Sequence, residues 1–363
     1  MSGEDKSLME RIEMPSVPQD ARAKLALVEE ELARAGLEQM RKSVLRYAPI
    51  YKKREEVISL PSVKPDFWAR VFSSAPPEID EYVLDDDAAI LGGPLKNVTV
   101  ERFEVDAEGN GEPRSVRFTF EFDPEENDYF DNAKLVKEFY WRKQIIKTSS
   151  GKRRVWEGLV SDPVRINWKE GQDTTNGLLD AACDLFDAEK KGGDRKKLPE
   201  YEALVKKLEL LEAEQMNDDD EDVEMPEDDD DESHAGVSFF AFFGYRGRDI
   251  SAEQNKEAVK EDEERFVKMS KGEEVDEDED DEDDEDEDLE LLVDDLEDAE
   301  IFSDGEELAI ALAEDLWLNA LKYYAQSFQP NFDFEGLDME ELEGMDEDEE
   351  EGENAPPAKK ARN

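Results

Sequence analysis

Side chains that could carry out catalysis are scarce in this sequence. The chain has one cysteine, Cys183, and one histidine, His234, which lie in different segments. A nucleophile and its base must come within hydrogen-bond reach of each other. A single cysteine cannot form a disulfide within the chain, and one cysteine with one histidine is too few for the usual zinc clusters. No glycine-rich loop followed by Lys-Ser or Lys-Thr is present to bind phosphate. We therefore expect no catalytic residues, no cofactor and no metal site.

A carboxylate-rich loop between two apolar stretches superficially resembles a calcium loop, with side-chain oxygens at Asp123, Glu125 and Asn127. Asp128 stands where the sharp turn of an EF-hand needs glycine, and Lys134 stands where it needs a bidentate glutamate, so we do not expect calcium here. Tyr129 and Phe130 are expected to anchor the loop by packing. Either the loop is a plain connection or its carboxylates contact a basic partner. The candidate contacts in this loop are Glu125, Glu126, Asp128 and Asp131, and those later in the chain are Glu170 and Asp173.

Acidic runs dominate the charge of the chain. The sequence has 102 acidic and 45 basic residues, a formal charge of −57, and much of the excess lies in runs near 217–234, 271–288 and 331–363. Such runs repel themselves, so we expect disorder there. They also repel phosphates and attract polycations, which predicts a basic protein partner and no direct high-affinity nucleic-acid binding. Solubilising tails and weak calcium buffering are the alternatives. Candidate contacts in the runs are Asp218, Asp219, Asp278 and Asp280.

Basic clusters stand out against this background. Residues 152–154 and 190–197 could contact nucleic acid, bind an importin, fold back onto the acidic runs, or be ordinary solvated charge. The C-terminal Lys359, Lys360 and Arg362 follow two prolines and resemble a nuclear localisation signal, which suggests a nuclear protein that is also found in the cytoplasm. The sequence shows no apolar leader and no run long enough to span a membrane, so we expect a soluble intracellular protein.

The longest predicted element is a helix over residues 19–61, preceded by a flexible segment 1–18. Gly36 and Pro49 interrupt its apolar stripe, so we expect a kinked helix or two abutting helices. The helix either packs on its own domain or pairs with a second copy as a coiled coil, and we favour the homodimer. The predicted interface consists of Leu25, Val28, Leu32, Leu37, Met40, Val44, Tyr47, Tyr51 and Ile58.

The middle of the chain alternates apolar and polar residues, as half-buried strands do. The alternating segments are 95–105, 115–122, 133–143 and 155–168, which predict a four-stranded antiparallel sheet with one solvent-exposed face. Before the sheet, helical spacing predicts a short helix after Asp66. After the sheet, helical spacing returns from Asn176, and the last predicted helix is an apolar one over 307–325. The aromatic cluster 239–245 either packs on the sheet or forms an exposed binding spot. The pattern predicts an α+β fold.

Five stretches resemble the nucleosome assembly protein family, in the order and spacing found there. They are LRYAPIYKKREEVISLPSVKPDFWARVF, VRFTFEFDPEENDYFDNAKLVKEF, INWKEGQDTT, SFFAFF and LWLNALKYY. The SET, or template-activating-factor, branch is the most similar. The resemblance implies a dimerisation helix at 19–61 and an earmuff domain at 62–330, in which helices pack on the antiparallel sheet. Two features depart from the family pattern: acidic runs interrupt the second half of the domain, and residues 253–271 have no recognised counterpart.

The resemblance also implies function. We expect a nuclear, chromatin-associated histone chaperone that binds core histones through acidic surfaces, shields them from DNA and assists nucleosome assembly and disassembly. One alternative is an acidic inhibitor of a phosphatase or a histone acetyltransferase. Another is a general scaffold for basic proteins. Charge attracts any polycation, so the sequence does not distinguish the scaffold from the chaperone, nor one histone pair from another.

Overall fold

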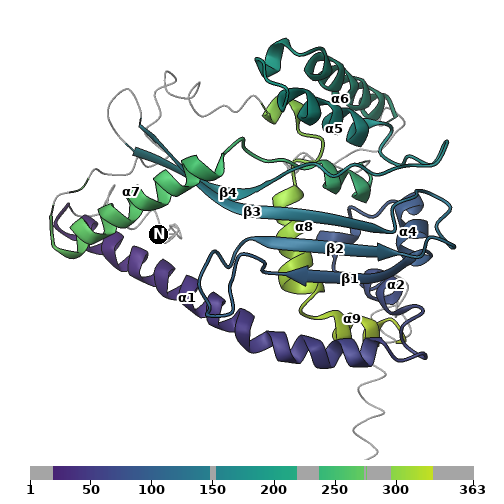
Figure 1. The fold of residues 1–363 in the computed structure, drawn as a ribbon, viewed down its shortest axis with the longest axis horizontal. Helices are drawn as coiled ribbons and strands as arrows, with labels where there is room; N and C mark the ends of the chain where they lie inside the picture. The colour runs from purple at the N-terminus through teal and green to yellow at the C-terminus, as the bar shows by residue number, and fades with distance from the viewer. Residues whose placement is uncertain (1–18, 148–152, 219–236, 274, 276–295, 330–363) are drawn as a thin grey trace, which may run out of the picture.

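The computed structural model describes residues 19–147, 153–218, 237–273, 275 and 296–329. They form an α+β fold in which helices surround a four-stranded antiparallel sheet, as predicted (Figure 1). A long helix runs along one side of the sheet and a pair of helices lies at the other. The expected flexible N-terminus at 1–18, the acidic inserts and the C-terminal tail lie wholly or mostly outside the described residues.

The sheet consists of consecutive strands in the order β1-β2-β3-β4, each antiparallel to its neighbour. Their bounds are β1 Leu95–Glu101, β2 Val116–Phe122, β3 Lys134–Lys147 and β4 Arg153–Ser161. The last strand ends before the predicted position because Pro163 has no N–H to donate to a ladder. The chain turns there instead, and Val164 N donates to Phe243 O at 2.8 Å.

One face of the sheet carries the core. In β2 the side chains of Val116, Phe118, Phe120 and Phe122 are buried, whereas the residues between them point to the other face. The 3-10 segment η3 (Phe239–Gly244) packs against this buried face, and all four of its phenylalanines are fully buried. Ring centroids of Phe139 and Phe242 lie 5.2 Å apart. The aromatic cluster is therefore core, and its interpretation as an exposed binding spot is wrong.

Helix α1 (Gln19–Ile58) is one continuous helix that includes Pro49, so the alternative of two abutting helices is wrong. Its apolar stripe divides between two directions. Ile58 is buried in the core of its own chain, which makes its assignment to a dimer interface wrong. Tyr51 packs on the domain with its ring centroid 5.4 Å from that of Trp317. The other predicted contacts range from half-buried to exposed: Leu37, Met40 and Val44 are half-buried, and Leu25, Val28, Leu32 and Tyr47 are exposed.

Shorter helices complete the fold. Between α1 and β1 lie α2 (Phe67–Phe72), α3 (Pro77–Asp80) and α4 (Asp85–Gly92). After β4 come α5 (Leu178–Glu189), the 3-10 turn η2 (Arg195–Lys197), α6 (Pro199–Asp218) and, beyond η3, α7 (Ala252–Ser270). The chain then forms the 3-10 turn η6 (Glu297–Ala299), α8 (Gly305–Ala311), the π-turn η7 (Leu312–Leu316) and α9 (Ala320–Gln326).

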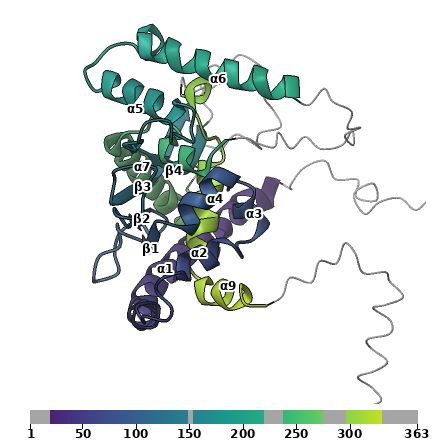
Figure 2. The same cartoon turned by 90° about the vertical axis from the view of Figure 1, so that its right-hand side faces the viewer.

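The apolar helix predicted for 307–325 is thus split by a π-turn into α8 and α9, whose buried residues line the core beside the sheet. A quarter-turn view shows the layers: α5 and α6 lie on one side of the strands, and α1 and α9 lie on the other (Figure 2). None of the described helices is both long enough and apolar enough to cross a bilayer.

Candidate functional site: an acidic loop surface

The loop between β2 and β3 is held rigid by its own polar side chains. Asp123 Oδ1 accepts from Glu125 N at 2.9 Å. Asn127 is buried, and its Oδ1 accepts from Tyr129 N at 3.0 Å and from Phe130 N at 3.1 Å. Each bond closes a tight turn, which is why Asp and Asn occur at these positions. The conformation of the loop is therefore fixed by its own hydrogen bonds, so it is more than a plain connection between strands.

Phe130 fixes this loop to the core, as predicted. Its side chain is 1% exposed, and its ring centroid lies 4.9 Å from that of Phe122 and 5.3 Å from that of Trp168. Tyr129, the second predicted anchor, is half-buried and packs against the core. A buried aromatic group at the loop centre leaves the flanking carboxylates on the outside.

Backbone and lysine contacts join the loop to the segment that follows β4. Asp131 N donates to Asn167 O at 3.0 Å, and Lys169 N donates to Tyr129 O at 2.8 Å. Lys169 Nζ also donates to Asn127 O at 2.6 Å. Two segments that are separated by both β3 and β4 in the sequence therefore form one surface.

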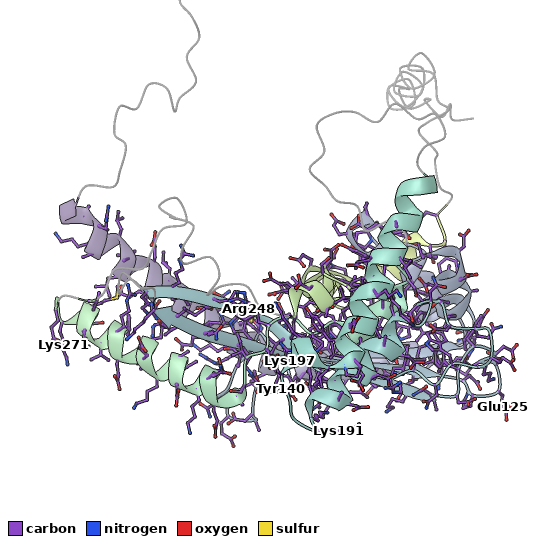
Figure 3. All side chains as sticks on the ribbon, turned by 90° about the horizontal axis from the view of Figure 1, so that it is seen from above. Glu125, Tyr140, Lys191, Lys197, Arg248 and Lys271 are labelled. Atoms are coloured by element: carbon purple, nitrogen blue, oxygen red, sulfur yellow. The ribbon has the colours of Figure 1, made fainter. Side chains whose placement is uncertain are left out.

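This acidic loop surface consists of five exposed carboxylates. Glu125 lies at one extreme end of the molecule, remote from Lys271 at the other end (Figure 3). Within the surface, Lys96 Nζ lies 2.5 Å from Glu126 Oε2. Asp173 does not belong to the surface, because its carboxylate accepts from Thr175 N and from Gly177 N, both at 2.9 Å, at the start of α5. The members of the surface are Glu125, Glu126, Asp128, Asp131 and Glu170.

A second group of carboxylates, on α5, was not singled out in the sequence. Asp180, Asp184 and Asp187 share one face at helical spacing. Arg165 lies against all three: its Nη1 is 2.9 Å from Asp180 Oδ1, and its Nη2 is 2.6 Å from Asp184 Oδ1 and 3.6 Å from Asp187 Oδ2. An arginine from the chain itself thus shows how these three aspartates can bind a guanidinium.

The solvent-exposed face of the sheet is nearly neutral rather than acidic. Arg117 Nε lies 2.6 Å from Glu138 Oε1, and Lys134 Nζ lies 2.7 Å from Glu121 Oε1. Cross-strand pairs of this kind cancel the charge of the face locally. The acidic excess of the described domain therefore lies in its loops and helices.

Lys137 in β3 is a polar residue that sequence reasoning missed. It is fully buried, and its Nζ donates to the carbonyl oxygens of Tyr245 at 2.7 Å, Asp162 at 2.9 Å and Phe243 at 3.1 Å. Burial lowers the pKa of this amine to about 7. The alternation of β3 would have placed Lys137 on the core face between Leu135 and Phe139, which was the available signal. Lys137 thereby ties β3 to the C-terminal end of η3 and to the residue that follows β4.

The predicted basic cluster at 152–154 is not a free surface. Arg153 and Arg154 are buried, at 3% and 9% exposure, and Arg153 Nη2 lies 2.8 Å from Asp262 Oδ1. The interpretations of these two residues as solvated charge or as a nucleic-acid contact are therefore wrong, because both side chains are buried and α7 pairs with Arg153. In the second cluster, Lys190, Lys191, Lys196 and Lys197 are exposed, and Arg195 Nε lies 2.6 Å from Glu189 Oε1.

Two observations in the described part of the chain concern the cysteine and metal ligation. Cys183 is buried in the core, and burial raises the pKa of its thiol to about 11, which disfavours a reactive thiolate. Within the described ranges, no group of three or more His, Cys, Asp and Glu side chains is arranged to hold a metal ion.

Several predicted contacts fall where side chains are not described. Asp218 is the last residue of α6. Outside the described residues lie Asp219, Asp278, Asp280, Lys359, Lys360 and Arg362.

Known proteins place this architecture in a family. The chain is 32% identical over 148 residues to a protein of Schizosaccharomyces pombe named as a nucleosome assembly protein, a match covering 41% of this chain and 57% of the relative. It is 30% identical over 131 residues to Protein SET of Drosophila melanogaster, covering 36% and 42% of the two chains. The chain thus spans about half the length of the curated relatives it matches.

The crystal structure of Ccp1 is similar at 23% identity with a TM-score of 0.46, covering 85% of this chain and 95% of that one. The model of the nucleosome assembly protein family matches residues 61–327, a range that contains the whole sheet, the acidic loop surface and α5 to α9. The chain belongs to the nucleosome assembly protein family.

Proposed function

We propose that this protein is a histone chaperone that binds core histones, shields them from DNA and assists nucleosome assembly and disassembly. Family membership supports the class of function. The observation that carries the binding site is the acidic loop surface, where Phe130 and Lys169 hold five exposed carboxylates on one rigid edge. Histones are rich in Lys and Arg, and carboxylates form charge-assisted hydrogen bonds to both.

The carboxylates of the acidic loop surface and those of the acidic runs would contribute to binding in different ways. Carboxylates on a shaped surface can select a folded histone pair, because their spacing must match that of its basic side chains. The acidic runs, including Asp218, Asp219, Asp278 and Asp280, add many weak contacts that raise the effective concentration of the partner. We propose that the acidic loop surface contributes specificity and that the runs contribute salt-sensitive affinity.

Binding of purified histone pairs to the full chain at about 0.3 M salt, where charges are screened beyond roughly 6 Å, tests this division. The test variant changes Glu125, Glu126, Asp128, Asp131 and Glu170 to their amides. A matched control changes five exposed carboxylates elsewhere: Glu29, Glu31, Glu202, Glu209 and Glu257. We expect the test variant to bind at least about fivefold more weakly than the control.

A competing polycation, polylysine, separates the chaperone from its alternatives. Retention of histones against polylysine indicates a shaped site. Equal displacement of histones from wild type and both variants would reject the acidic loop surface as the site and favour a general scaffold for basic proteins. Inhibition of a phosphatase or an acetyltransferase in a histone-free assay would instead favour the inhibitor.

We also infer that two copies pair through α1 in antiparallel orientation. The exposed apolar residues on the outer face of the helix are Leu25, Val28, Leu32, Tyr47, Ile50 and Val57, of which Ile50 and Val57 were not in the predicted set. Four of them are arranged symmetrically: antiparallel pairing can place Leu25 opposite Val57 and Leu32 opposite Ile50. Gly36 and Ser43 then lie near the centre, where their small side chains allow close approach.

Sedimentation of Leu32→Glu tests the pairing, because Leu32 is 67% exposed in the single chain. A buried glutamate at the helix pair should shift the protein to a monomer. Leu210→Glu, at a 55% exposed position on α6, is the control and should sediment like wild type. A Leu32→Glu protein that stays dimeric would reject this interface.

Nuclear residence is the remaining part of the proposal. The C-terminal Lys359, Lys360 and Arg362 form a basic run of the kind that importins bind. Replacing the three by alanine in a fluorescent fusion should move the protein from the nucleus to the cytoplasm. Unchanged nuclear accumulation would place the signal elsewhere.

A further inference from the structure

Helix α7 is attached to the β3–β4 hairpin mainly through polar side chains. Asp262 Oδ2 lies 2.9 Å from Lys143 Nζ, and Asp262 Oδ1 lies 2.8 Å from Arg153 Nη2. Asn255 Oδ1 accepts from Lys143 N at 2.8 Å. One carboxylate thus joins two cations that belong to neighbouring strands.

The other contact of α7 is with the dimerisation helix. Arg34 Nη1 of α1 lies 2.5 Å from Glu263 Oε2, and the guanidinium carbon of Arg34 lies 4.0 Å from the ring centroid of Phe266. Arg34 Nε is also 2.6 Å from Glu30 of its own helix. Figure 1 shows α7 running between the hairpin and the N-terminal half of α1. The helix therefore connects two elements that lie far from each other in sequence.

Apolar support for this docking is small. The buried residues of α7 are Ala258 and Met269, whereas Val259 and Val267 are 52% and 40% exposed. The polar contacts to the hairpin are shielded, with side-chain exposures of 15% for Lys143, 16% for Asp262 and 3% for Arg153. The pair to α1 is open to salt, because the side chains of Arg34 and Glu263 are 31% and 58% exposed. Removal of one partner from such a network leaves an uncompensated charge, which strongly destabilises the contact.

We propose that α7 is an electrostatic latch, which holds the N-terminal half of α1 against the β3–β4 hairpin and opens when salt screens its carboxylates or a polycation binds them. The latch goes beyond the proposed histone binding and does not depend on it, because all of its contacts lie within one chain. Opening releases Arg34 and thereby the N-terminal half of the helix that carries Leu25, Val28 and Leu32. Ionic conditions would then control how firmly the dimerisation helix is fixed to the domain.

Hydrogen exchange of the full chain tests the latch at about 0.05 M and 0.5 M salt. In the wild type, amides of α7 should exchange about tenfold faster at the higher salt, whereas those of β1 and β2 should keep their protection. Asp262→Asn and Arg34→Gln should exchange fast in α7 at both salt concentrations. Glu264→Gln is the matched control, because this residue pairs only weakly, at 3.8 Å, with Lys260 of the same helix.

Other outcomes would overturn the proposal. Apolar docking predicts that salt leaves α7 protection unchanged or increases it, and both latch variants should then exchange like the control. If Asp262→Asn loosens the whole sheet, Arg34→Gln decides, because Arg34 lies outside the sheet. Added polylysine should mimic high salt in the wild type, and its failure to speed exchange in α7 would reject opening by a polycation.

Discussion

Arg54 of α1 lies against Trp317, near the start of the last helical segment. Its guanidinium carbon is 3.8 Å from the ring centroid of Trp317 and 4.6 Å from that of Tyr51, and its Nη1 donates to the Trp317 carbonyl oxygen. Trp317 in turn stacks on Trp68 of α2: the rings are parallel, and their centroids lie 5.9 Å apart. The C-terminal end of α1 is thereby built into the core of the domain.

Replacement of Arg54 by alanine should lower the free energy of unfolding by about 2–4 kcal/mol. The change removes a cation–π contact and a charged hydrogen bond from a site that is 7% exposed. Urea denaturation measures the effect. Arg46→Ala, at an exposed position of the same helix, is the control and should change stability by less than about 0.5 kcal/mol. Equal midpoints for the two variants would show that Arg54 does not join α1 to the domain.

Lys137→Met should destabilise the fold by about 2–4 kcal/mol, because three buried carbonyl oxygens lose their donor. The effect should also depend on pH. Burial lowers the pKa of Lys137 to about 7, so between pH 7 and its ordinary value of 10.5 the unfolded chain holds a proton that the folded chain has released. The unfolded state binds more protons in this range, and stability contributed by Lys137 therefore rises with pH.

Denaturation of wild type and Lys137→Met at several pH values checks the sign. The stability of the wild type relative to the variant should be constant below pH 7 and should rise between pH 7 and about 10. Lys134→Met, at the exposed start of the same strand, serves as the control. A difference that is flat over the whole range would mean that the pKa of the buried amine is not lowered.

Arg165→Gln should increase histone affinity. The change frees Asp180, Asp184 and Asp187 from an internal guanidinium, so that a histone side chain can take its place. We expect binding to be about two- to fivefold tighter at 0.15 M salt, since partly exposed ion pairs contribute little each. Lys64→Gln removes the same charge from an exposed position and is the control. Equal affinities of the two variants would show that these aspartates do not bind histone.

Cysteine cross-linking should reveal the register of the α1 pair. With Cys183 replaced by alanine, Leu25→Cys combined with Val57→Cys should form a disulfide-linked dimer under mild oxidation. The two positions are about 48 Å apart along one helix, so the bond can form only between chains. Leu25→Cys combined with Tyr47→Cys is the control, because antiparallel pairing does not place these residues opposite each other. Efficient cross-linking of the control alone would contradict the proposed register.

The sequence alone determined the secondary structure and the class of fold. Alternate burial of Val116, Phe118, Phe120 and Phe122 is visible as a period of two, because successive side chains of a strand point to opposite faces. Helical spacing similarly predicted α1, and family-specific stretches such as the one from Val116 to Phe139 predicted the architecture that the structure shows.

Tertiary structure decided which face each side chain meets. A stripe of apolar residues marks a helix face but not its partner, so only the packing shows that Ile58 and Tyr51 face their own domain while Ile50 and Val57 face outward. A charged residue in the sequence likewise does not reveal whether its side chain is exposed or buried. Arg153 and Lys137 look like surface residues in the sequence, yet α7 covers the first and backbone carbonyls from distant segments enclose the second.

The same reason applies to the acidic loop surface. Glu125 and Glu170 are separated by two strands in the sequence, and they share one surface because Phe130 packs beside Trp168 and Lys169 reaches back to Asn127. Contacts between residues distant in the chain depend on how strands pair and where loops return. Local patterns of polarity do not contain that information, so it emerges only when the chain is folded.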